Sequence, residues 1–165
     1  VAGERVSAID CFTRSLAADG TSASAWHFLG VLGGGRVAGK YYTKSAAFAQ
    51  ALSIDGNKAR YWNAMGLYAG GGTVNGTHFT KCQCYAQCVV VANSSDAWRT
   101  LGIFCDGGTV LGKHHTKNEC FARAAEVDSD DPRPWKLMSI WGGGTVGGVA
   151  YSAAECLAKH DALKT

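Results

Sequence analysis

Four of the five tryptophans in this chain follow one another at nearly constant intervals of 36, 36 and 37 residues, at Trp26, Trp62, Trp98 and Trp135. An apolar residue follows each of them at the third position, and a small residue at the fourth, at Gly30, Gly66, Gly102 and Ser139. A period of this length is typical of a solenoid, in which each repeat buries its apolar face only by stacking on its neighbours. The intervals predict a single repeat array over residues 1–165, with a half repeat at 1–22 that holds one helix and full repeats at 23–58, 59–94, 95–130 and 131–165.

Each repeat is predicted to contain two helices with a small hairpin between them. Residues 24–32 place apolar side chains three and four positions apart, which favours a helix, and the glycines at 33–35 end it. The Asn75-Gly76 pair, flanked by residues that favour strands, is a strong hairpin signal. A second helix then opens with capping boxes, which pair Thr80 with Gln83, Thr116 with Glu119, and Ser152 with Glu155.

The two predicted helices carry a recognisable pattern. The first, helix A, begins with Trp-x-x-Leu-Gly, and the second, helix B, carries an aromatic residue followed three positions later by a small one, at Phe48, Tyr85 and Phe121. An acidic turn with Asp131-Pro132 follows. The pattern covers essentially the whole chain and resembles the tetratricopeptide repeat family, in a glycine-rich variety that is longer than the family's usual unit of about 34 residues. The resemblance implies an all-α, right-handed solenoid of about 4.5 repeats with short β-hairpin inserts, in which the tryptophans, glycines and helix B aromatics named above pack the repeats together.

The two ends of the sequence show no polar capping repeat. Residues 1–3 match the hairpin residues 37–39, and the last residues follow directly on a helix B. Solenoids normally need capping repeats because the last apolar face would otherwise meet water. We therefore expect either a window of a longer array or subunits that stack end to end, a type of contact that builds filaments.

Composition excludes two classes of partner. The net charge is only +3 and the sequence has no basic run, so nucleic acid is not a predicted partner. No apolar stretch approaches the 18 or so residues of a membrane span, so no span is predicted.

The seven cysteines divide by their position in the repeat. Four of them occupy one position of helix B, which predicts a buried packing residue, at Cys11, Cys84, Cys120 and Cys156. Cys88 aligns with Ala51 and Ala124 and is also predicted to pack in the core, which leaves Cys82 and Cys105 without a repeat position. Because the start of one helix B should lie beside the end of the next helix A, a disulfide of Cys105 with Cys82 or Cys84 is predicted.

Two Asn-x-Ser/Thr tripeptides, at Asn75 and Asn93, lie in predicted loops and could accept N-linked glycans. Together with the disulfide, they favour an extracellular or secretory location, with the cytoplasm as the alternative.

No catalytic, metal or cofactor site is predicted. His78 shares a helix start with Cys82, Cys84 and Cys88, but structural zinc needs four converging ligands, and this cluster does not recur. No oxyanion feature or orienting carboxylate stands in a fixed relation to any cysteine and histidine, so the chain is not expected to be an enzyme.

The resemblance implies a concave groove lined by helix A. Its polar residues would be His27, Arg60, Asn63, Arg99, Arg133 and Lys136. Two functions follow. The first is a non-enzymatic structural or assembly protein that acts through protein–protein contacts, either with copies of itself or with further repeats. The alternative is an adaptor that binds an acidic or extended peptide in this groove.

Overall fold

The computed structural model describes residues 7–165, so the match of residues 1–3 to a hairpin lies outside the described part. The chain divides into two compact units, Val1–Cys84 and Tyr85–Thr165, and the boundary falls inside helix α5 (Lys81–Ala92).

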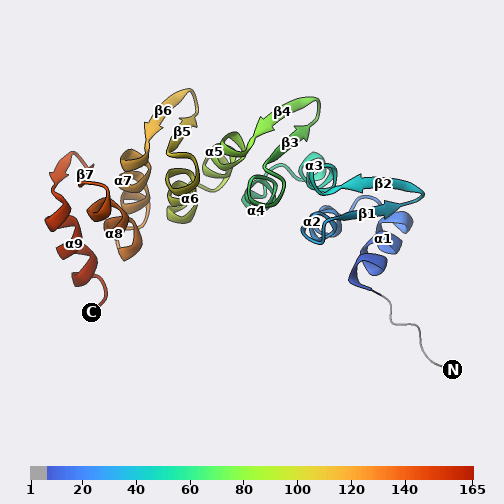
Figure 1. The fold of residues 1–165 in the computed structure, drawn as a ribbon, viewed down its shortest axis with the longest axis horizontal. Helices are drawn as coiled ribbons and strands as arrows, with labels where there is room; N and C mark the ends of the chain where they lie inside the picture. Colours follow the sequence, from blue (N-terminus) through green and yellow to red (C-terminus); the bar gives the residue numbers. More distant parts are fainter. Residues whose placement is uncertain (1–6) are drawn as a thin grey trace. The chain divides into compact units, whose positions relative to one another are not determined.

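The first unit repeats the order helix, hairpin, helix (Figure 1). Its elements are α1 (Ala8–Ala18), α2 (Ala23–Val31), β1 (Gly34–Val37), β2 (Lys40–Thr43), α3 (Lys44–Ile54), α4 (Ala59–Ala64), η1 (Met65–Ala69), β3 (Gly71–Val74), β4 (Thr77–Thr80) and the first residues of α5.

The second unit continues in the same order from the rest of α5. Its elements are α6 (Ser95–Cys105), β5 (Gly107–Val110), β6 (Lys113–Thr116), α7 (Lys117–Val127), α8 (Pro132–Ile140), β7 (Gly144–Val146), β8 (Val149–Tyr151) and α9 (Ala153–Ala162).

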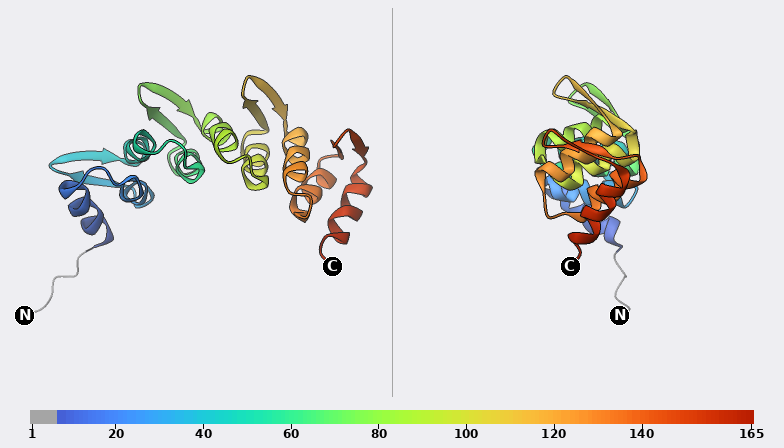
Figure 2. Two further views of the ribbon diagram at one scale, coloured as in Figure 1. Left: turned by 180° about the vertical axis from the view of Figure 1, so that it is seen from behind. Right: turned by 90° about the vertical axis from the view of Figure 1, so that its left-hand side faces the viewer.

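The predicted all-α class is wrong, because the protein mixes α and β structure. Residues 7–165 contain nine α-helices, one π-helical segment and four two-stranded antiparallel sheets. The glycine-rich segments are strands with a complete ladder, as in the pairing of Gly71 with Thr80 through Val74 with Thr77. Figure 2 shows the paired strands of each unit from two further directions.

Local sequence sets where the helices begin. The capping boxes predicted for helix B are present, with Thr116 and Glu119 at the start of α7 and Ser152 and Glu155 at the start of α9. At the start of α5, the side chain of Gln83 accepts from the backbone of Thr80, and the backbone of Gln83 donates to the hydroxyl of Thr80. Caps of this kind stabilise a helix by about 1 kcal/mol each.

One additional residue separates the tryptophan from the hairpin in the second full repeat, where Trp62 precedes Gly71 by nine positions and Trp26 precedes Gly34 by eight. In this repeat the helix continues into the π-helical turn η1, which is followed by Gly70 in a left-handed conformation. The third full repeat has the same nine-residue interval, from Trp98 to Gly107, but there α6 continues to Cys105 and Asp106 takes the left-handed conformation. The additional residue is therefore accommodated in two different ways.

Helix A packs closely on helix B because a glycine faces an aromatic ring. A Cβ atom added to Gly30 would lie 2.7 Å from Cδ1 of Phe48, and one added to Gly102 would lie 2.6 Å from Cε1 of Phe121. Both rings are fully buried. The packing role predicted for these residues therefore has a steric basis in α2 with α3 and in α6 with α7.

Hairpins β3–β4 and β7–β8 each pack along the helix B that precedes them, α3 and α7. The base of the hairpin is held where Ser45 Oγ of α3 donates to the Gly71 carbonyl at 3.1 Å. The tip is held where Ser53 Oγ, near the end of α3, donates to Asn75 Oδ1 at 2.8 Å. In the second unit, Asn118 and Glu126 of α7 bind the base and tip of hairpin β7–β8 in the same way, through Gly143 and Gly147. The hairpins are thus integral to the packing of the repeats.

Every repeat tryptophan contacts the second strand of its own hairpin. The ring centroids are 4.6 Å apart for Trp26 and Tyr42, 4.8 Å for Trp62 and Phe79, 4.9 Å for Trp98 and His115, and 5.0 Å for Trp135 and Tyr151. Aromatic pairs at this spacing contribute about 0.5–1.5 kcal/mol beyond their buried area. The tryptophan therefore fixes the hairpin to helix A.

Candidate functional site

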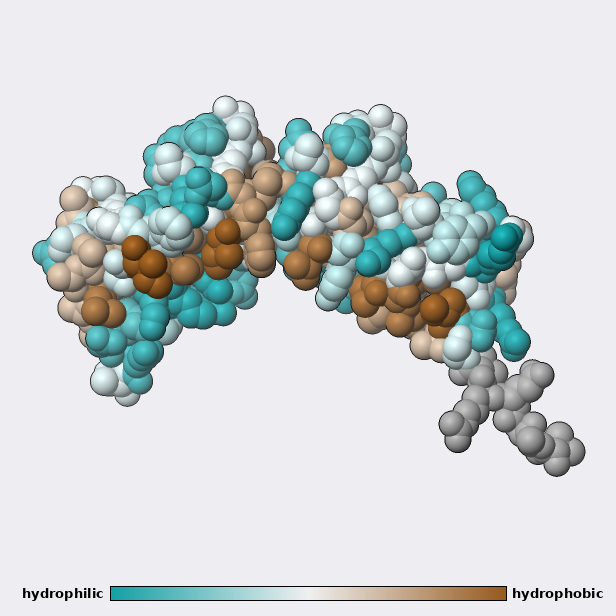
Figure 3. Space-filling view, viewed as in Figure 1, coloured by the Kyte–Doolittle hydropathy of each residue, from teal (hydrophilic) through white to brown (hydrophobic). Residues whose placement is uncertain are grey.

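The end of each helix A exposes two consecutive large apolar side chains. We call these pairs the apolar ends; they are Val31 with Leu32, Leu67 with Tyr68, Ile103 with Phe104, and Ile140 with Trp141. Their side chains are between 37% and 63% exposed. Figure 3 shows that hydrophobic atoms on this face gather over the helices, whereas the hairpins are mostly hydrophilic or neutral. Each unit therefore displays two apolar ends.

In the first unit, the predicted groove residues are largely engaged within the chain. The ring of His27 packs 5.0 Å from Tyr61 and 5.8 Å from Phe48. Burial, and to a smaller extent the charge of Arg60, lower the pKa of His27 below its usual value. The guanidinium of Arg60 donates to the hydroxyls of Ser24 at 3.1 Å and Tyr61 at 3.0 Å. Asn63 is half-buried on α4.

In the second unit, acidic side chains neutralise the predicted groove arginines. Arg99 forms an ion pair with Asp96, and Arg133 pairs with Asp96 at 3.1 Å and with Asp131 at 2.7 Å. Burial alone would raise the pKa of Asp131, but hydrogen bonds from Arg133 and Ser95 lower it to about 2. Asp131 is therefore ionised at neutral pH and remains a partner for Arg133.

The structure divides the six predicted groove residues between the two units. His27, Arg60 and Asn63 belong to the first, whereas Arg99, Arg133 and the exposed Lys136 belong to the second. Neither unit by itself assembles the full set.

The buried thiols are unsuited to nucleophilic chemistry. Burial raises the pKa of Cys84 to about 11 and that of Cys120 to about 12, so both are protonated at neutral pH. Among residues 7–165, no group of three His, Cys, Asp or Glu side chains is placed to hold a metal ion.

Cys82 and Cys105, the two cysteines without a predicted packing role, are both disulfide-bonded. Cys82 and Cys105 do not titrate for that reason, whereas Cys84 is a free, buried thiol. The pairing of Cys105 with Cys82 stays a prediction.

The two predicted glycosylation tripeptides differ in their surroundings. Asn75 lies at an exposed hairpin tip with Gly76 and Thr77 also exposed. Asn93 is exposed too, and both asparagine side-chain oxygens accept a hydrogen bond, that of Asn75 from Ser53 and that of Asn93 from Trp98 Nε1. Ser95 of the second tripeptide, however, is buried and donates to Asp131. Asn75 is therefore the more accessible acceptor in the folded chain. Over the described part of the chain, every helix is too short or too polar to cross a membrane.

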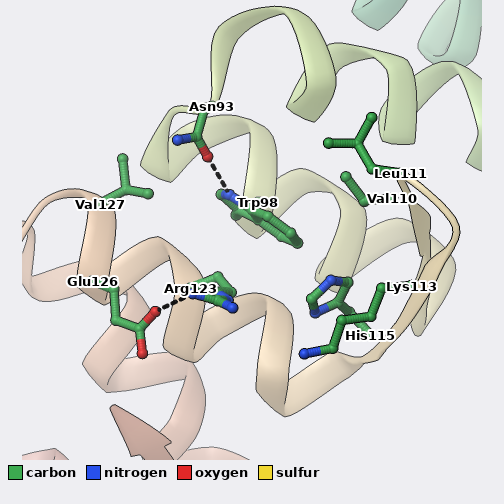
Figure 4. A pocket seen from close by; sticks show the side chains of 9 residues that line it. All are labelled: Asn93, Trp98, Val110, Leu111, Lys113, His115, Arg123, Glu126 and Val127. Atoms are coloured by element: carbon green, nitrogen blue, oxygen red, sulfur yellow. Dashed lines mark hydrogen bonds and ion pairs between the residues drawn. The ribbon is translucent and has the colours of Figure 1, made fainter. Parts of the chain in front are cut away.

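A cavity of about 460 Å³ lies beneath hairpin β5–β6 in the second unit, a feature that the sequence did not reveal. Figure 4 shows side chains around it from α6 and the turn before it, from the hairpin and from α7. We call it the β5–β6 cavity; its lining residues are Asn93, Trp98, Val110, Leu111, Lys113, His115, Arg123, Glu126 and Val127. A hollow of about 240 Å³ shares four of them and extends to Thr145 and Gly148 of the next hairpin.

The polar groups of the β5–β6 cavity are arranged around α7. Arg123 and Glu126 form an ion pair at 2.9 Å, and the other carboxylate oxygen of Glu126 accepts from the backbone of Gly147 at 2.9 Å. Lys113 is exposed on β6. Burial is the main cause that lowers the pKa of His115, assisted by Lys113, Arg123 and His114 and opposed by Glu119. His115 is therefore neutral at pH 7.

We expect the stability of the protein to fall as the pH drops from 7 to 5. The pKa values of His115 and His27 are lowered in the folded chain, whereas a histidine of the unfolded chain has a pKa of about 6.5. As the pH falls through this value, the unfolded chain binds protons before the folded chain does, and the free energy of unfolding therefore decreases. Urea unfolding at several pH values measures this loss. The substitution His115→Phe should make the loss smaller, and an unchanged pH dependence in that variant would contradict the assignment.

Leu111 occupies an unfavourable conformation at the tip of hairpin β5–β6. Its φ is +49° and it is 84% exposed, whereas Asn75 takes the equivalent place in hairpin β3–β4 with a φ of +48°. A left-handed residue with a branched side chain costs about 1–2 kcal/mol, and asparagine tolerates this region. Leu111→Asn should therefore raise the free energy of unfolding by about 1 kcal/mol. The reciprocal change Asn75→Leu should lower it, and equal values for the two variants in urea titration would refute the argument.

No protein-family model matches the chain, and no curated protein is significantly similar to it.

Proposed function

We propose that this chain is a non-enzymatic structural protein that assembles through protein–protein contacts, with copies associating through the apolar ends. The observation that carries the proposal is that every helix A ends in an exposed apolar pair. Apolar surface of this kind, repeated through a chain, is typical of interaction sites. A second copy offers the same pairs, so two copies can bind through a two-fold contact to which each contributes the same surface.

The chemistry of the side chains supports a contact function over catalysis. The buried thiols are protonated at neutral pH, and the arginines of the second unit are paired with Asp96 and Asp131. The disulfide-bonded Cys82 and Cys105 support an extracellular or secretory location as part of the proposal.

Light scattering coupled to size-exclusion chromatography tests the assembly. We expect a mass above the 17.3 kDa of one chain that increases with protein concentration. Ile140→Lys, at an apolar end, should shift the mass toward one chain. Val149→Lys is the matched control, because Val149 is equally apolar and 55% exposed but lies in hairpin β7–β8. A mass of one chain at every concentration, or equal effects of the two substitutions, would overturn the proposal.

A second candidate function is the binding of an acidic peptide. One observation favours it: the β5–β6 cavity has a volume in the usual range of ligand sites, and its lining holds two cationic side chains, Lys113 and Arg123, against one carboxylate, Glu126.

A further inference from the structure

The third full repeat differs from the others at several positions that meet in one place. His115 stands where the other hairpins carry Tyr42, Phe79 and Tyr151, and Leu111 stands where they carry Ala38, Asn75 and Gly147. On helix B, Glu126 stands in place of Ser53, Val90 and Ala162. All three of these distinctive residues line the β5–β6 cavity. Because the repeats share the same order of helices and hairpin, they serve as internal comparisons, and these three differences meet at this one cavity.

The cavity has an apolar part and a cationic part. Trp98, Val110, Leu111 and Val127 supply the apolar surface, and the indole nitrogen of Trp98 is already bound to Asn93. Leu111 is retained at the rim in a left-handed conformation although it is almost fully exposed. A strained and exposed leucine lowers the stability of the protein when no ligand is bound. Its presence at this position is best explained by a ligand that covers it.

The charges favour an anionic ligand. Two cations, Lys113 and Arg123, stand against one carboxylate, Glu126, in the lining of the cavity, so the net charge of the lining is positive while His115 is neutral. Glu126 pairs with Arg123 through one carboxylate oxygen and accepts from the backbone of Gly147 through the other. Arg123 has five donor hydrogens, and its bond to Glu126 leaves others to bind a second carboxylate. Lys113 adds a second positive charge beside it on β6, as Figure 4 shows.

We propose that the β5–β6 cavity binds an extended acidic peptide segment that places one apolar side chain beside a carboxylate. The apolar side chain lies against Trp98 and Leu111, and the carboxylate accepts hydrogen bonds from Lys113 and Arg123. This site lies on the hairpin side of the second unit and uses none of the helix A residues predicted from the sequence. The proposal deepens the second candidate function and does not depend on self-association.

The test is a nuclear magnetic resonance titration of the isotope-labelled protein with an acetylated and amidated pentapeptide, Glu-Glu-Leu-Glu-Glu. We expect saturable shifts of the amides of residues 110–115 and 123–127 and of the Trp98 indole. Peptides with alanine for the leucine, or with lysine for each glutamate, should bind more weakly. Three results would overturn the proposal. They are the absence of saturable shifts, saturable shifts centred on Arg99, Arg133 and Lys136, and the same shifts on addition of inorganic phosphate alone.

Two variants separate binding from folding. Lys113→Gln should lower the affinity for the peptide by about tenfold, the loss expected when one charge-assisted hydrogen bond is removed. Lys136→Gln, which removes an exposed lysine of the same unit from α8, should leave the affinity unchanged. Leu111→Asn should weaken binding by roughly threefold or more although it stabilises the fold. Unaltered affinity in both Lys113→Gln and Leu111→Asn would contradict the site, whatever the result of the assembly test.

Discussion

Replacing Gly107 by alanine is expected to lower the free energy of unfolding by about 4 kcal/mol, the sum of backbone strain and a steric clash. Gly107 has a φ of +112°, a conformation that side chains rarely adopt. A Cβ atom there would overlap the carbonyl oxygen of His115 and lie 2.9 Å from the carbonyl carbon of Thr116. Both are backbone atoms of the paired strand, so neither can move without opening the hairpin.

Gly112→Ala provides the matched control for this prediction. Gly112 also has a positive φ, +80°, but an added Cβ would meet no atom within 4 Å. Its replacement should cost only about 1 kcal/mol, from strain alone. Urea unfolding followed by tryptophan fluorescence measures both values. Similar losses for the two variants would show that the close approach of the strands at Gly107 does not exist.

Replacing Gly102 by valine is expected to cost about 3 kcal/mol, because it overpacks the contact of helix A with helix B. The new Cβ would lie 2.6 Å from Cε1 of Phe121 and 3.2 Å from Cβ of Cys120. Phe121 and Cys120 are both fully buried, so the ring has no free space to enter.

A second change, Phe121→Leu, should restore part of the stability lost in Gly102→Val. Alone, it removes a few buried carbon atoms and should cost about 1 kcal/mol. The double variant should lose less stability than the sum of the two single losses, and the difference, the coupling energy, should be at least about 1 kcal/mol. The fourth repeat supports this expectation, since Ser139 and Leu157 take the equivalent places. Strict additivity would mean that Gly102 and Phe121 do not constrain each other.

The local elements of the fold were predictable because their signals are short-range. The capping boxes at Thr116 and Ser152 and the turn at Asn75-Gly76 each depend on residues within a few positions of one another. The fold class was nevertheless mispredicted as all-α. The glycine-rich segments were treated as inserts in a helical repeat, whereas they pair fully and pack on the preceding helix B.

The contacts between elements were less predictable. The pairing of Trp98 with His115 joins residues 17 positions apart, and no local pattern announces it. Comparison of the repeats could have found it, because Tyr42, Phe79 and Tyr151 share one position. The groove predicted along helix A shows the opposite limit, since here the residues were identified but their partners were not. Arg99 and Arg133 carry suitable charges, but the sequence could not show that Asp96 and Asp131 already bind them.

Two separate surfaces carry the proposed functions. The apolar ends recur in the four full repeats, whereas the β5–β6 cavity is built around the hairpin of the third full repeat. A surface that recurs along the chain is suited to assembly, and a cavity with its own set of side chains is suited to selective recognition. The two proposals can therefore succeed or fail independently.

The most direct test of assembly through the apolar ends is hydrogen exchange measured at two protein concentrations about a hundredfold apart, so that mass action favours association at the higher one. Our account predicts slower exchange at the higher concentration in the four segments 28–32, 65–69, 101–105 and 137–141, and unchanged exchange at the hairpin tips. Exchange in these segments that is independent of concentration, or protection confined to other elements, would contradict the proposal.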